Sequence, residues 1–241
     1  MTCAISIQEV TLNPSAARLI SINLEIGTGE YFGLVGMNGA GKTSLLKSML
    51  DFCRPDLGQI KISGRASHQL NSRQQIAYLP ERFQAPAHLT GERFLRRMMA
   101  LYQRPYQAEA TLALFDHLAL NPAALNMRLG HHSKGMAQKL GLIACLLSKR
   151  PILILDEPMS GLDPYARVRL KQLLQQRRQQ EGIDQTMIIC SHMLGDVESL
   201  CDRLAILHHG KLLFVGTPTE CQQKFSAESL EAAYMNCVTA P

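Results

Sequence analysis

Residues 36–43 read Gly36-Met37-Asn38-Gly39-Ala40-Gly41-Lys42-Thr43, and this stretch decides the fold. It matches the phosphate-binding pattern G-x-x-x-x-G-K-[ST] in full. Glycines in such a loop let backbone N–H groups converge on phosphate oxygens without clashes from Cβ atoms. The side chain of Lys42 can reach the β- and γ-phosphates of a nucleotide, and the hydroxyl of Thr43 can bind Mg²⁺. The stretch therefore predicts a binding loop for a nucleoside triphosphate.

The segments on either side of this loop have the pattern that such a site requires. Residues 31–35 are apolar apart from one glycine and predict a buried strand, and residues 44–50 predict a helix. A helix that begins at the loop directs the positive end of its dipole toward the phosphates. A chance glycine-rich turn is the alternative, but it would not require a strand before it and a helix after it.

The composition is that of an ordinary globular protein. The chain has 241 residues, of which 46% are hydrophobic and 19% are charged. No apolar run approaches the roughly 18–20 residues of a membrane span, and residues 1–6 lack the features of a signal peptide. We therefore expect a cytosolic protein that acts at a membrane only through a partner. The net charge of +5 is mild, so no nucleic-acid partner is expected.

The seven cysteines do not form a metal or disulfide pattern. They are scattered along the chain, none lies in a C-x-x-C pair, and Cys145 and Cys190 lie in apolar contexts. Their number is odd. This usage predicts reduced thiols in a reducing compartment.

Hydrophobic periodicity divides the chain into strand-rich ends and a helical middle. Apolar residues recur at near-helical spacing between residues 83 and 148, which predicts a mostly helical insertion. Residues 164–181 predict a further helix, and helices are expected near 217–224 and 227–236. The predicted strands are 5–10, 22–26, 31–35, 59–62, 76–79, 152–155, 186–190, 203–207 and 211–215.

Two acidic residues follow the apolar strand that ends at Leu155. Placing the carboxylates of Asp156 and Glu157 at the end of an apolar strand costs free energy unless a charged group faces them. A Mg²⁺-nucleotide is such a group. Asp156 would hold Mg²⁺ beside Thr43, while Glu157 would polarise the attacking water. The alternative is that both are surface acids at a strand-to-loop corner. The presence of a phosphate-binding loop in the same chain makes this alternative unfavoured.

His192 follows another buried strand, in the sequence Cys190-Ser191-His192. An imidazole there could contact the γ-phosphate and position the water. A single histidine is more often structural. Its place at the carboxyl end of a strand favours a function, because ligands of such sheets bind at that edge.

Four segments together resemble an ATP-binding-cassette (ABC) ATPase, the motor subunit of ABC transporters: the loop at 36–43, Asp156-Glu157, Ser160-Gly161-Leu162-Asp163 and Ser191-His192. The resemblance covers nearly the whole chain. It implies an α/β fold with a P-loop NTPase core and a parallel sheet, an N-terminal antiparallel β layer and an inserted α-helical subdomain. The expected domain is single, with its core in residues 1–82 and 149–241 and the helical signature subdomain in 83–148. The resemblance assigns the ATP contacts to Gly36, Met37, Asn38, Gly39, Ala40, Gly41, Lys42, Thr43 and Ser44.

The signature segment of the family falls on Ser133, Lys134, Gly135 and Met136, after His132. Ser133 can cap the helix that begins there, which is an ordinary structural role. The resemblance adds that Ser133, Gly135 and the helix N-terminus contact the γ-phosphate bound by a second protomer, in a head-to-tail dimer. In the same family pattern, Asp163 links the two shared sites.

The chain departs from the usual family pattern in three places. The signature usually begins with Leu and has Gly-Gly-Gln after its Ser, where this chain has His132 and Lys134-Gly135-Met136. Glu81 stands where a Gln near Mg²⁺ is usual, and the resemblance gives it that Mg²⁺ role. The aromatic that usually stacks on adenine is missing, because residues 12–15 read Leu12-Asn13-Pro14-Ser15.

The resemblance implies an ATPase that uses ATP and Mg²⁺, forms a homodimer or heterodimer of cassettes, and drives a separate integral membrane permease from the inner face of the cell membrane. The segment Ser133-Lys134-Gly135-Met136 is similar to that of the branch that serves exporters. A soluble ABC ATPase without a transport role, such as one for iron–sulfur assembly, is the main alternative. A regulatory nucleotide sensor with negligible hydrolysis is a third.

Overall fold

The computed structural model describes residues 2–13, 18–179 and 184–239. The chain forms two compact units. The first unit comprises Met1–Ile76, Pro151–Asp156 and Asp184–Pro241, and the second comprises Ala77–Arg150 and Glu157–Ile183. The predicted division into a core and a helical subdomain of residues 83–148 stays a prediction.

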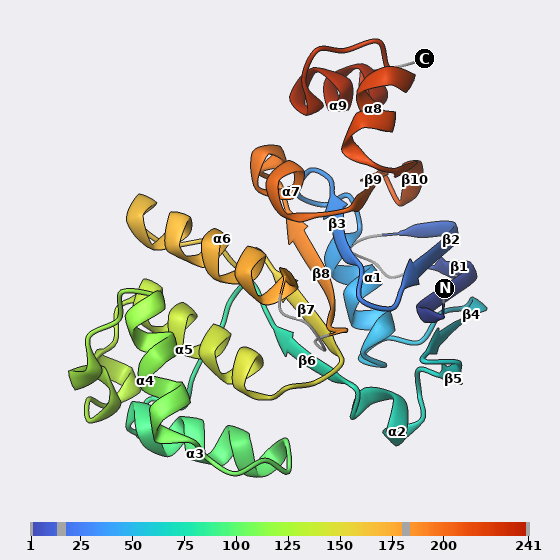
Figure 1. Cartoon of the computed structure of the whole chain (residues 1–241). Helices are drawn as coiled ribbons and strands as arrows, with labels where there is room; N and C mark the ends of the chain where they lie inside the picture. Colours follow the sequence, from blue (N-terminus) through green and yellow to red (C-terminus); the bar gives the residue numbers. More distant parts are fainter. Residues whose placement is uncertain (1, 14–17, 180–183, 240–241) are drawn as a thin grey trace. The chain divides into compact units, whose positions relative to one another are not determined.

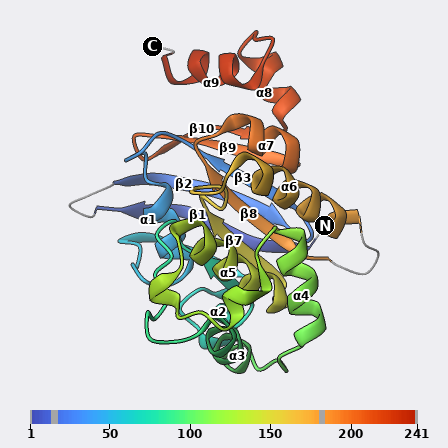
Figure 2. The same ribbon diagram turned by 90° about the vertical axis from the view of Figure 1, so that its left-hand side faces the viewer.

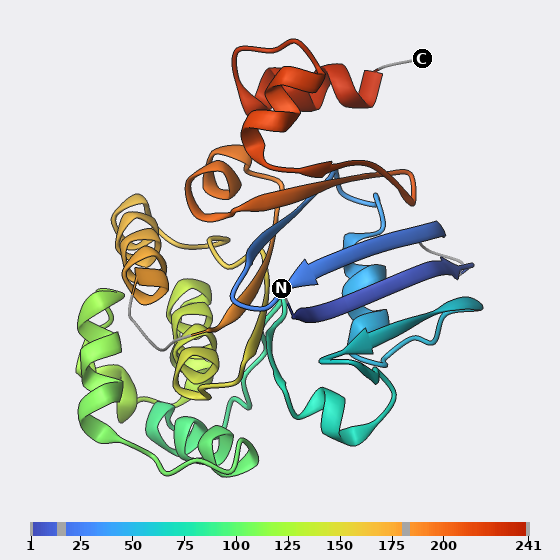
Figure 3. The same cartoon turned by 45° about the vertical axis from the view of Figure 1, so that its right-hand side comes forward.

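An antiparallel sheet opens the first unit. Its strands are β1 (Cys3–Leu12), β2 (Leu19–Gly27), β4 (Leu57–Ile62) and β5 (Arg65–Ala66), in the order β2-β1-β4-β5. Figure 3 shows β1, β2 and β4 side by side in blue and teal. Ile22, Leu24 and Ile26 are buried, whereas Asn23 and Glu25 between them are exposed. This alternation confirms the predicted half-buried strand.

A larger, mostly parallel sheet carries the buried strands of the first unit. The order of its strands in this unit is β10-β9-β3-β8-β7. The bounds are β3 (Tyr31–Val35), β7 (Ile152–Asp156), β8 (Thr186–Ser191), β9 (Arg203–His208) and β10 (Lys211–Gly216). Every residue of β3, β7 and β8 is buried, which is why these segments are continuous apolar runs. The strands β3, β7, β8 and β9 run parallel, and β10 forms the predicted hairpin with β9 (Figure 1).

Helices of the first unit pack on its two sheets and on one another. They are α1 (Lys42–Met49), α2 (Leu70–Arg73), α7 (Leu194–Leu200), α8 (Pro218–Lys224) and α9 (Leu230–Thr239). Gly33 lets α7 approach β3, because a Cβ at that position would lie 2.3 Å from Val197 Cγ1. Helix α9 buries Leu230, Ala233 and Cys237 on one face and contacts α7, α8 and β10. Figure 1 shows α8 and α9 in red near the C-terminus.

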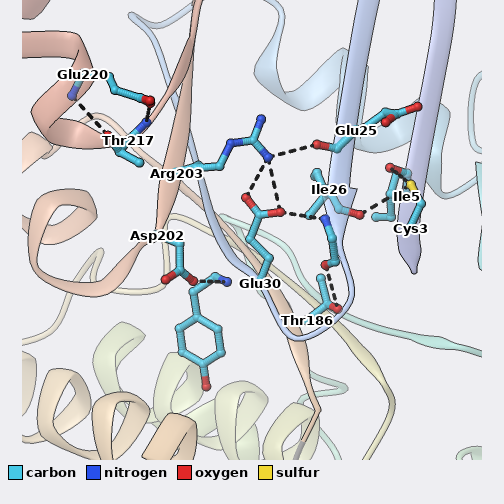
Figure 4. A network of polar contacts seen from close by, with 12 residues as sticks. Cys3, Ile5, Glu25, Ile26, Glu30, Thr186, Asp202, Arg203, Thr217 and Glu220 are labelled. Carbon is cyan, nitrogen blue, oxygen red and sulfur yellow. Dashed lines mark hydrogen bonds and ion pairs between the residues drawn. The ribbon is translucent and has the colours of Figure 1, made fainter. Parts of the chain in front are cut away.

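Polar contacts fix the start of β3, the strand that leads to the phosphate-binding loop (Figure 4). The N–H of Tyr31 donates to Asp202 Oδ2 at 2.9 Å. The Glu30 carboxylate accepts from the Gly27 N–H at 2.6 Å and forms an ion pair with Arg203 Nη1 at 3.2 Å. The turn between β2 and β3 and the start of β9 are therefore joined at the end of β3 opposite the loop.

The second unit is mostly helical, as the periodicity predicts. It holds β6 (Ile76–Leu79) from Ala77 onward, then α3 (Gly91–Leu101), α4 (Ala108–His117), α5 (Lys134–Leu147) and α6 (Pro164–Gln179), with short 3₁₀ turns at Pro122–Leu125 and Leu129–His131. Figure 2 shows α4 and α5 next to each other in yellow-green. Phe94, Leu95, Phe115, Leu140 and Ile143 are among the buried residues of its core.

Candidate nucleotide site

Three parallel strands of the first unit end at the same edge of the sheet. Val35, the last residue of β3, pairs with Ser191, the last residue of β8. Asp156, the last residue of β7, pairs with Cys190 of β8. The register therefore brings the loop that follows Val35, the carboxylate of Asp156 and the Ser191-His192 segment to one edge. This is the edge at which ligands of parallel sheets bind.

The loop itself holds Lys42 in a position suited to an anion. Lys42 is only 7% exposed, and its ammonium group donates to the carbonyl of Gly36 and to that of Met37, the latter at 3.3 Å. Helix α1 begins at Lys42 after Gly41, whose φ is 111° and whose position provides no side-chain cap. An anion bound at this N-terminus would therefore accept hydrogen bonds from the first N–H groups of α1, because no capping side chain accepts them.

Neighbouring strands brace the loop from behind. A Cβ at Gly36 would lie 2.3 Å from the carbonyl oxygen of Leu207, and one at Gly41 would lie 2.8 Å from Leu19 Cδ2. The N–H of Gly210, in the β9–β10 turn, donates to the Ala40 carbonyl at 2.9 Å. The carbonyl of Gly210 accepts from the Ile20 N–H at 2.8 Å. The sequence alone does not predict this brace, because it joins segments that only the fold brings together.

The oxygen ligands that the first unit offers are suited to Mg²⁺. Asp156 is 3% exposed at the end of β7, and the Thr43 hydroxyl lies at the start of α1 in an exposed residue. Both offer the hard oxygen atoms that Mg²⁺ prefers, and this ion usually takes only one or two protein carboxylates alongside phosphates and waters. The predicted third donor, Glu81, is an exposed residue of the second unit, and its role at the metal stays a prediction.

Glu157 follows Asp156 directly and belongs to the second unit by its contacts. The residue is 9% exposed, and its φ is 50°, a left-handed conformation that is unfavourable for a side chain with a Cβ. Its carbonyl accepts from the Ser160 N–H at 3.0 Å. A strained backbone at a buried acid is typical of functional sites.

The signature segment lies at the start of α5 in the second unit. Ser133 caps this helix, because its Oγ accepts from the Met136 N–H at 3.2 Å. Ser133 and Lys134 are exposed. Gly135 lies close to the loop that follows β7, since a Cβ on it would be 2.7 Å from the Gly161 carbonyl oxygen. The signature segment and the segment Ser160–Asp163 are thus in contact within one unit.

A second contact joins helix α5 to the segment Ser160–Asp163. Asp163 accepts from the Ala166 N–H at 2.9 Å and lies 3.8 Å from the Lys139 ammonium. The hydrogen bond from Ala166, with a smaller contribution from Lys139, lowers the pKa of Asp163. Lys139 is buried, although the predictions from sequence gave it no role. The sequence points to Lys139 only through its position shortly after the signature segment.

The structure also bears on the missing adenine-stacking aromatic. Leu12 ends β1 and is 3% exposed, so its side chain is part of the core. Asn13 is exposed, while Pro14 and Ser15 lie outside the described residues. The predicted absence of a stacking side chain at this segment stays a prediction.

The sequence profile of the ABC transporter family matches residues 19–160 of this chain. The chain belongs to the ABC transporter family. It is 35% identical over 212 residues to an ABC transporter ATP-binding protein of Nostoc sp., in a match that covers 87% of this chain and 62% of that protein. It is 32% identical over 209 residues to the Nod factor export ATP-binding protein I of Burkholderia orbicola, covering 82% of this chain and 65% of that protein. The chain thus spans less than two thirds of the length of these ABC relatives.

Solved structures of ABC proteins share the fold. The ATP-binding subunit of an ABC transporter superposes with a TM-score of 0.86 at 27% identity, covering 97% of this chain and 99% of that chain. A dimeric ATP-binding cassette in a post-hydrolysis state with ADP and Pi gives a TM-score of 0.77 at 20% identity, covering 88% of this chain and 98% of that chain. The predicted mixed α/β fold with a parallel-rich sheet and an antiparallel sheet is confirmed.

Within residues 2–13, 18–179 and 184–239, no helix has both the length and the apolar character needed to cross a membrane.

Proposed function

We propose that this chain is the ATP-binding subunit of an ABC transporter that binds and hydrolyses ATP in a head-to-tail dimer and powers a separate membrane permease. The observation that carries the proposal is the common edge at which β3, β7 and β8 end. That edge holds the phosphate-binding loop, Asp156 and the Ser191-His192 segment in one unit. Membership of the ABC transporter family supports the choice of nucleotide.

Each residue of the site has a chemical task in this proposal. Lys42 gives up the carbonyls of Gly36 and Met37 and takes the β- and γ-phosphate oxygens in their place. Glu157 accepts the proton of the attacking water, and His192 orients that water and the γ-phosphate. Thr43 and Asp156, with Glu81 as a further donor, hold Mg²⁺, which when bound neutralises charge on the phosphates.

The second copy of the chain completes each site. Its Ser133, Lys134, Gly135 and Met136 segment would meet the γ-phosphate held by the first copy, so that the N-terminus of α5 faces negative charge. The exposure of Ser133 and Lys134 supports this assignment. Asp163, whose carboxylate lies 3.8 Å from the Lys139 ammonium on α5, would link the two sites.

The direction of transport is proposed as export. This part of the proposal is supported by the relatives described as Nod factor export ATP-binding proteins, one of which is 32% identical to this chain. The cytoplasmic face of the cell membrane is the proposed location, reached through the permease. Its cargo would be selected by that permease.

The first test is Mg²⁺-dependent ATP hydrolysis by the purified chain. Glu157→Gln should remove most of the turnover, because the amide cannot accept a proton from water, while ATP binding should persist. Glu109→Gln on α4 is the matched control, since Glu109 is an exposed carboxylate of the same unit. Unchanged turnover in Glu157→Gln would overturn the role of Glu157, and no turnover in the unaltered protein would favour a nucleotide sensor.

The second test concerns the partner. A tagged chain purified from detergent-solubilised membranes of its own organism should bring down an integral membrane protein in a fixed ratio. Recovery of soluble partners alone would instead favour a soluble ABC ATPase of the iron–sulfur assembly kind. The two outcomes separate transport from the main alternative.

A further inference from the structure

The charged residues of this chain are distributed unequally between the two units. The first unit has 10 Lys and Arg residues and 13 Asp and Glu residues, whereas the second has 15 basic and 7 acidic residues. The modest net charge of the whole chain therefore combines a first unit of formal charge −3 with a helical unit of +8. An excess of this size on one compact unit attracts negatively charged partners.

Helix α3, green in Figure 1, carries several of these basic residues. One side of the helix buries apolar side chains, whereas Arg93 and Arg97 are exposed. These two arginines are four residues apart, so they lie on the same face of the helix. Arg104 is also exposed and follows the end of α3, where its N–H donates to the carbonyl of Met99 at 2.9 Å.

These three arginines have no acidic partner. Their side chains form no ion pair with any residue that the structure describes. Arg96 differs, because it pairs with Glu92 at 2.8 Å and lies over the Tyr106 ring at 4.3 Å. Glu92 is the only acidic residue of α3. The elements that pack most extensively against α3 are α5 and the turn Pro122–Leu125, and neither contains Asp or Glu.

Two further exposed residues extend this face. Arg128 is exposed, and its backbone pairs with that of Thr90, the residue before α3, in an isolated antiparallel bridge. Leu101 ends α3 four residues after Arg97, and it is 74% exposed. The result is a row of guanidinium groups beside one exposed apolar side chain. We call this set of residues the α3 surface: Arg93, Arg97, Leu101, Arg104 and Arg128.

We propose that the α3 surface contacts the anionic lipid headgroups of the membrane that holds the permease. Each arginine near an anionic leaflet is attracted to it, and Leu101 can enter the boundary between headgroups and acyl chains. The inference rests on the proposed function, which brings the chain to the cytoplasmic face of that membrane. This contact would orient the helical unit toward the bilayer in addition to the permease.

The composition of the α3 surface favours lipid over a protein partner. The centre of a protein–protein contact is mostly apolar and depleted of charge. The α3 surface has one apolar side chain among four guanidinium groups. Headgroups form an extended array of negative charge, which matches basic side chains spread along a helix and beyond both of its ends.

The experiment is flotation of the purified chain, without any permease, with vesicles of phosphatidylcholine or of phosphatidylcholine mixed with phosphatidylglycerol. At low salt the chain should float with the mixed vesicles and not with the neutral ones, and added salt should release it. The triple variant Arg93→Gln, Arg97→Gln, Arg104→Gln should bind the mixed vesicles roughly tenfold more weakly or less tightly still. Leu101→Ala should weaken binding by roughly two- to fivefold.

Two triple variants serve as controls. The first, Arg65→Gln, Lys149→Gln, Lys211→Gln, removes three exposed basic residues elsewhere and changes the net charge by the same amount. The second keeps the charge of the α3 surface by changing Arg93, Arg97 and Arg104 to lysine. Both should float with the mixed vesicles about as well as the unaltered chain.

The contrary results are equally clear. If the unaltered chain floats with neither kind of vesicle, or equally with both, the α3 surface does not bind anionic lipid. If the two glutamine variants lose binding to the same extent, net charge is responsible and the proposal fails. ATP hydrolysis in solution should be the same in all of these variants. Its absence in the unaltered chain would count against the proposed function, whatever the vesicles show.

Discussion

Gly36 shows how closely the phosphate-binding loop is fitted to its surroundings. An alanine Cβ at this position would lie 2.3 Å from the Leu207 carbonyl oxygen, a backbone atom of β9 that cannot move without displacing the strand. We expect Gly36→Ala to lower the free energy of unfolding by about 1–3 kcal/mol, the usual cost of overpacking. Urea denaturation followed by circular dichroism measures this change.

Gly195, in the same unit as Gly36, has room for a side chain. It lies in α7, a Cβ added to it would meet no atom closer than Glu231 Oε1 at 3.9 Å, and its backbone is not left-handed. Gly195→Ala should therefore raise the free energy of unfolding by about 0.5 kcal/mol through helix propensity. Equal effects of the two substitutions would show that the contact at Leu207 is not the cause.

At the residue scale, the sequence predicts the loop, Asp156 and His192 because short patterns carry their chemistry. The structure brings these three to one edge of a sheet through strand register, which no local pattern contains. The brace behind the loop could not be found this way. The N–H of Gly210 and the Ala40 carbonyl that it contacts lie far apart in the sequence, and only the fold brings them together.

Substitutions at two helix caps test whether the signature segment does more than begin a helix. Ser133 caps α5 by accepting from Met136 N at 3.2 Å, and Thr90 caps α3 by accepting from Arg93 N at 3.3 Å. Ser133→Ala and Thr90→Ala should each cost about 1 kcal/mol of stability, since each removes one capping hydrogen bond. Only Ser133→Ala should also reduce ATP hydrolysis well beyond what its loss of stability explains.

Thermal unfolding and steady-state ATPase assays measure the two effects. Ser133→Ala and Thr90→Ala form a matched pair, because both caps lie in the second unit and have nearly the same hydrogen-bond geometry. Equal turnover in the two variants would leave Ser133 with a capping role alone.

At the element scale, the sequence patterns predict the longer strands, the helical character of residues 83–148 and helices near α1, α6, α8 and α9. They do not predict α2, α7 or the short strand β5. The strands of the larger sheet are readily predicted because they are buried on both faces and read as unbroken apolar runs. Membership of a unit is harder to predict. Helix α6 follows a strand of the first unit yet belongs to the second by its contacts, which include hydrogen bonds from Arg169 to the carbonyls of His117 and Asp116.

The distribution of thiols offers a test at the scale of the whole molecule. All seven cysteines are free, five of them are buried, Cys3 is exposed and Cys53 is partly exposed. Burial raises the pKa of Cys145 to about 12 and that of Cys221 to about 11, so these thiols carry almost no thiolate at neutral pH. N-ethylmaleimide should therefore modify Cys3 and Cys53 in the native protein and all seven after denaturation.

Intact-mass spectrometry at increasing reaction times counts the adducts, and peptide mapping locates them. Burial and the Glu25 carboxylate raise the pKa of Cys3, so its labelling should become faster as the pH rises. Rapid native labelling of Cys145 would contradict the buried core described for the second unit.

The register of β3 has a consequence for how the protein is made. Tyr31 pairs with Met187 and Val35 pairs with Ile206, so both neighbours of this strand leave the ribosome long after it does. At ordinary synthesis rates the delay is roughly 10–30 s. During that time the apolar strand Tyr31–Val35 lacks both of its partners and is a natural client for chaperones. A nascent chain that stops before β8 would carry the complete phosphate-binding sequence and still have no sheet on which to hold it.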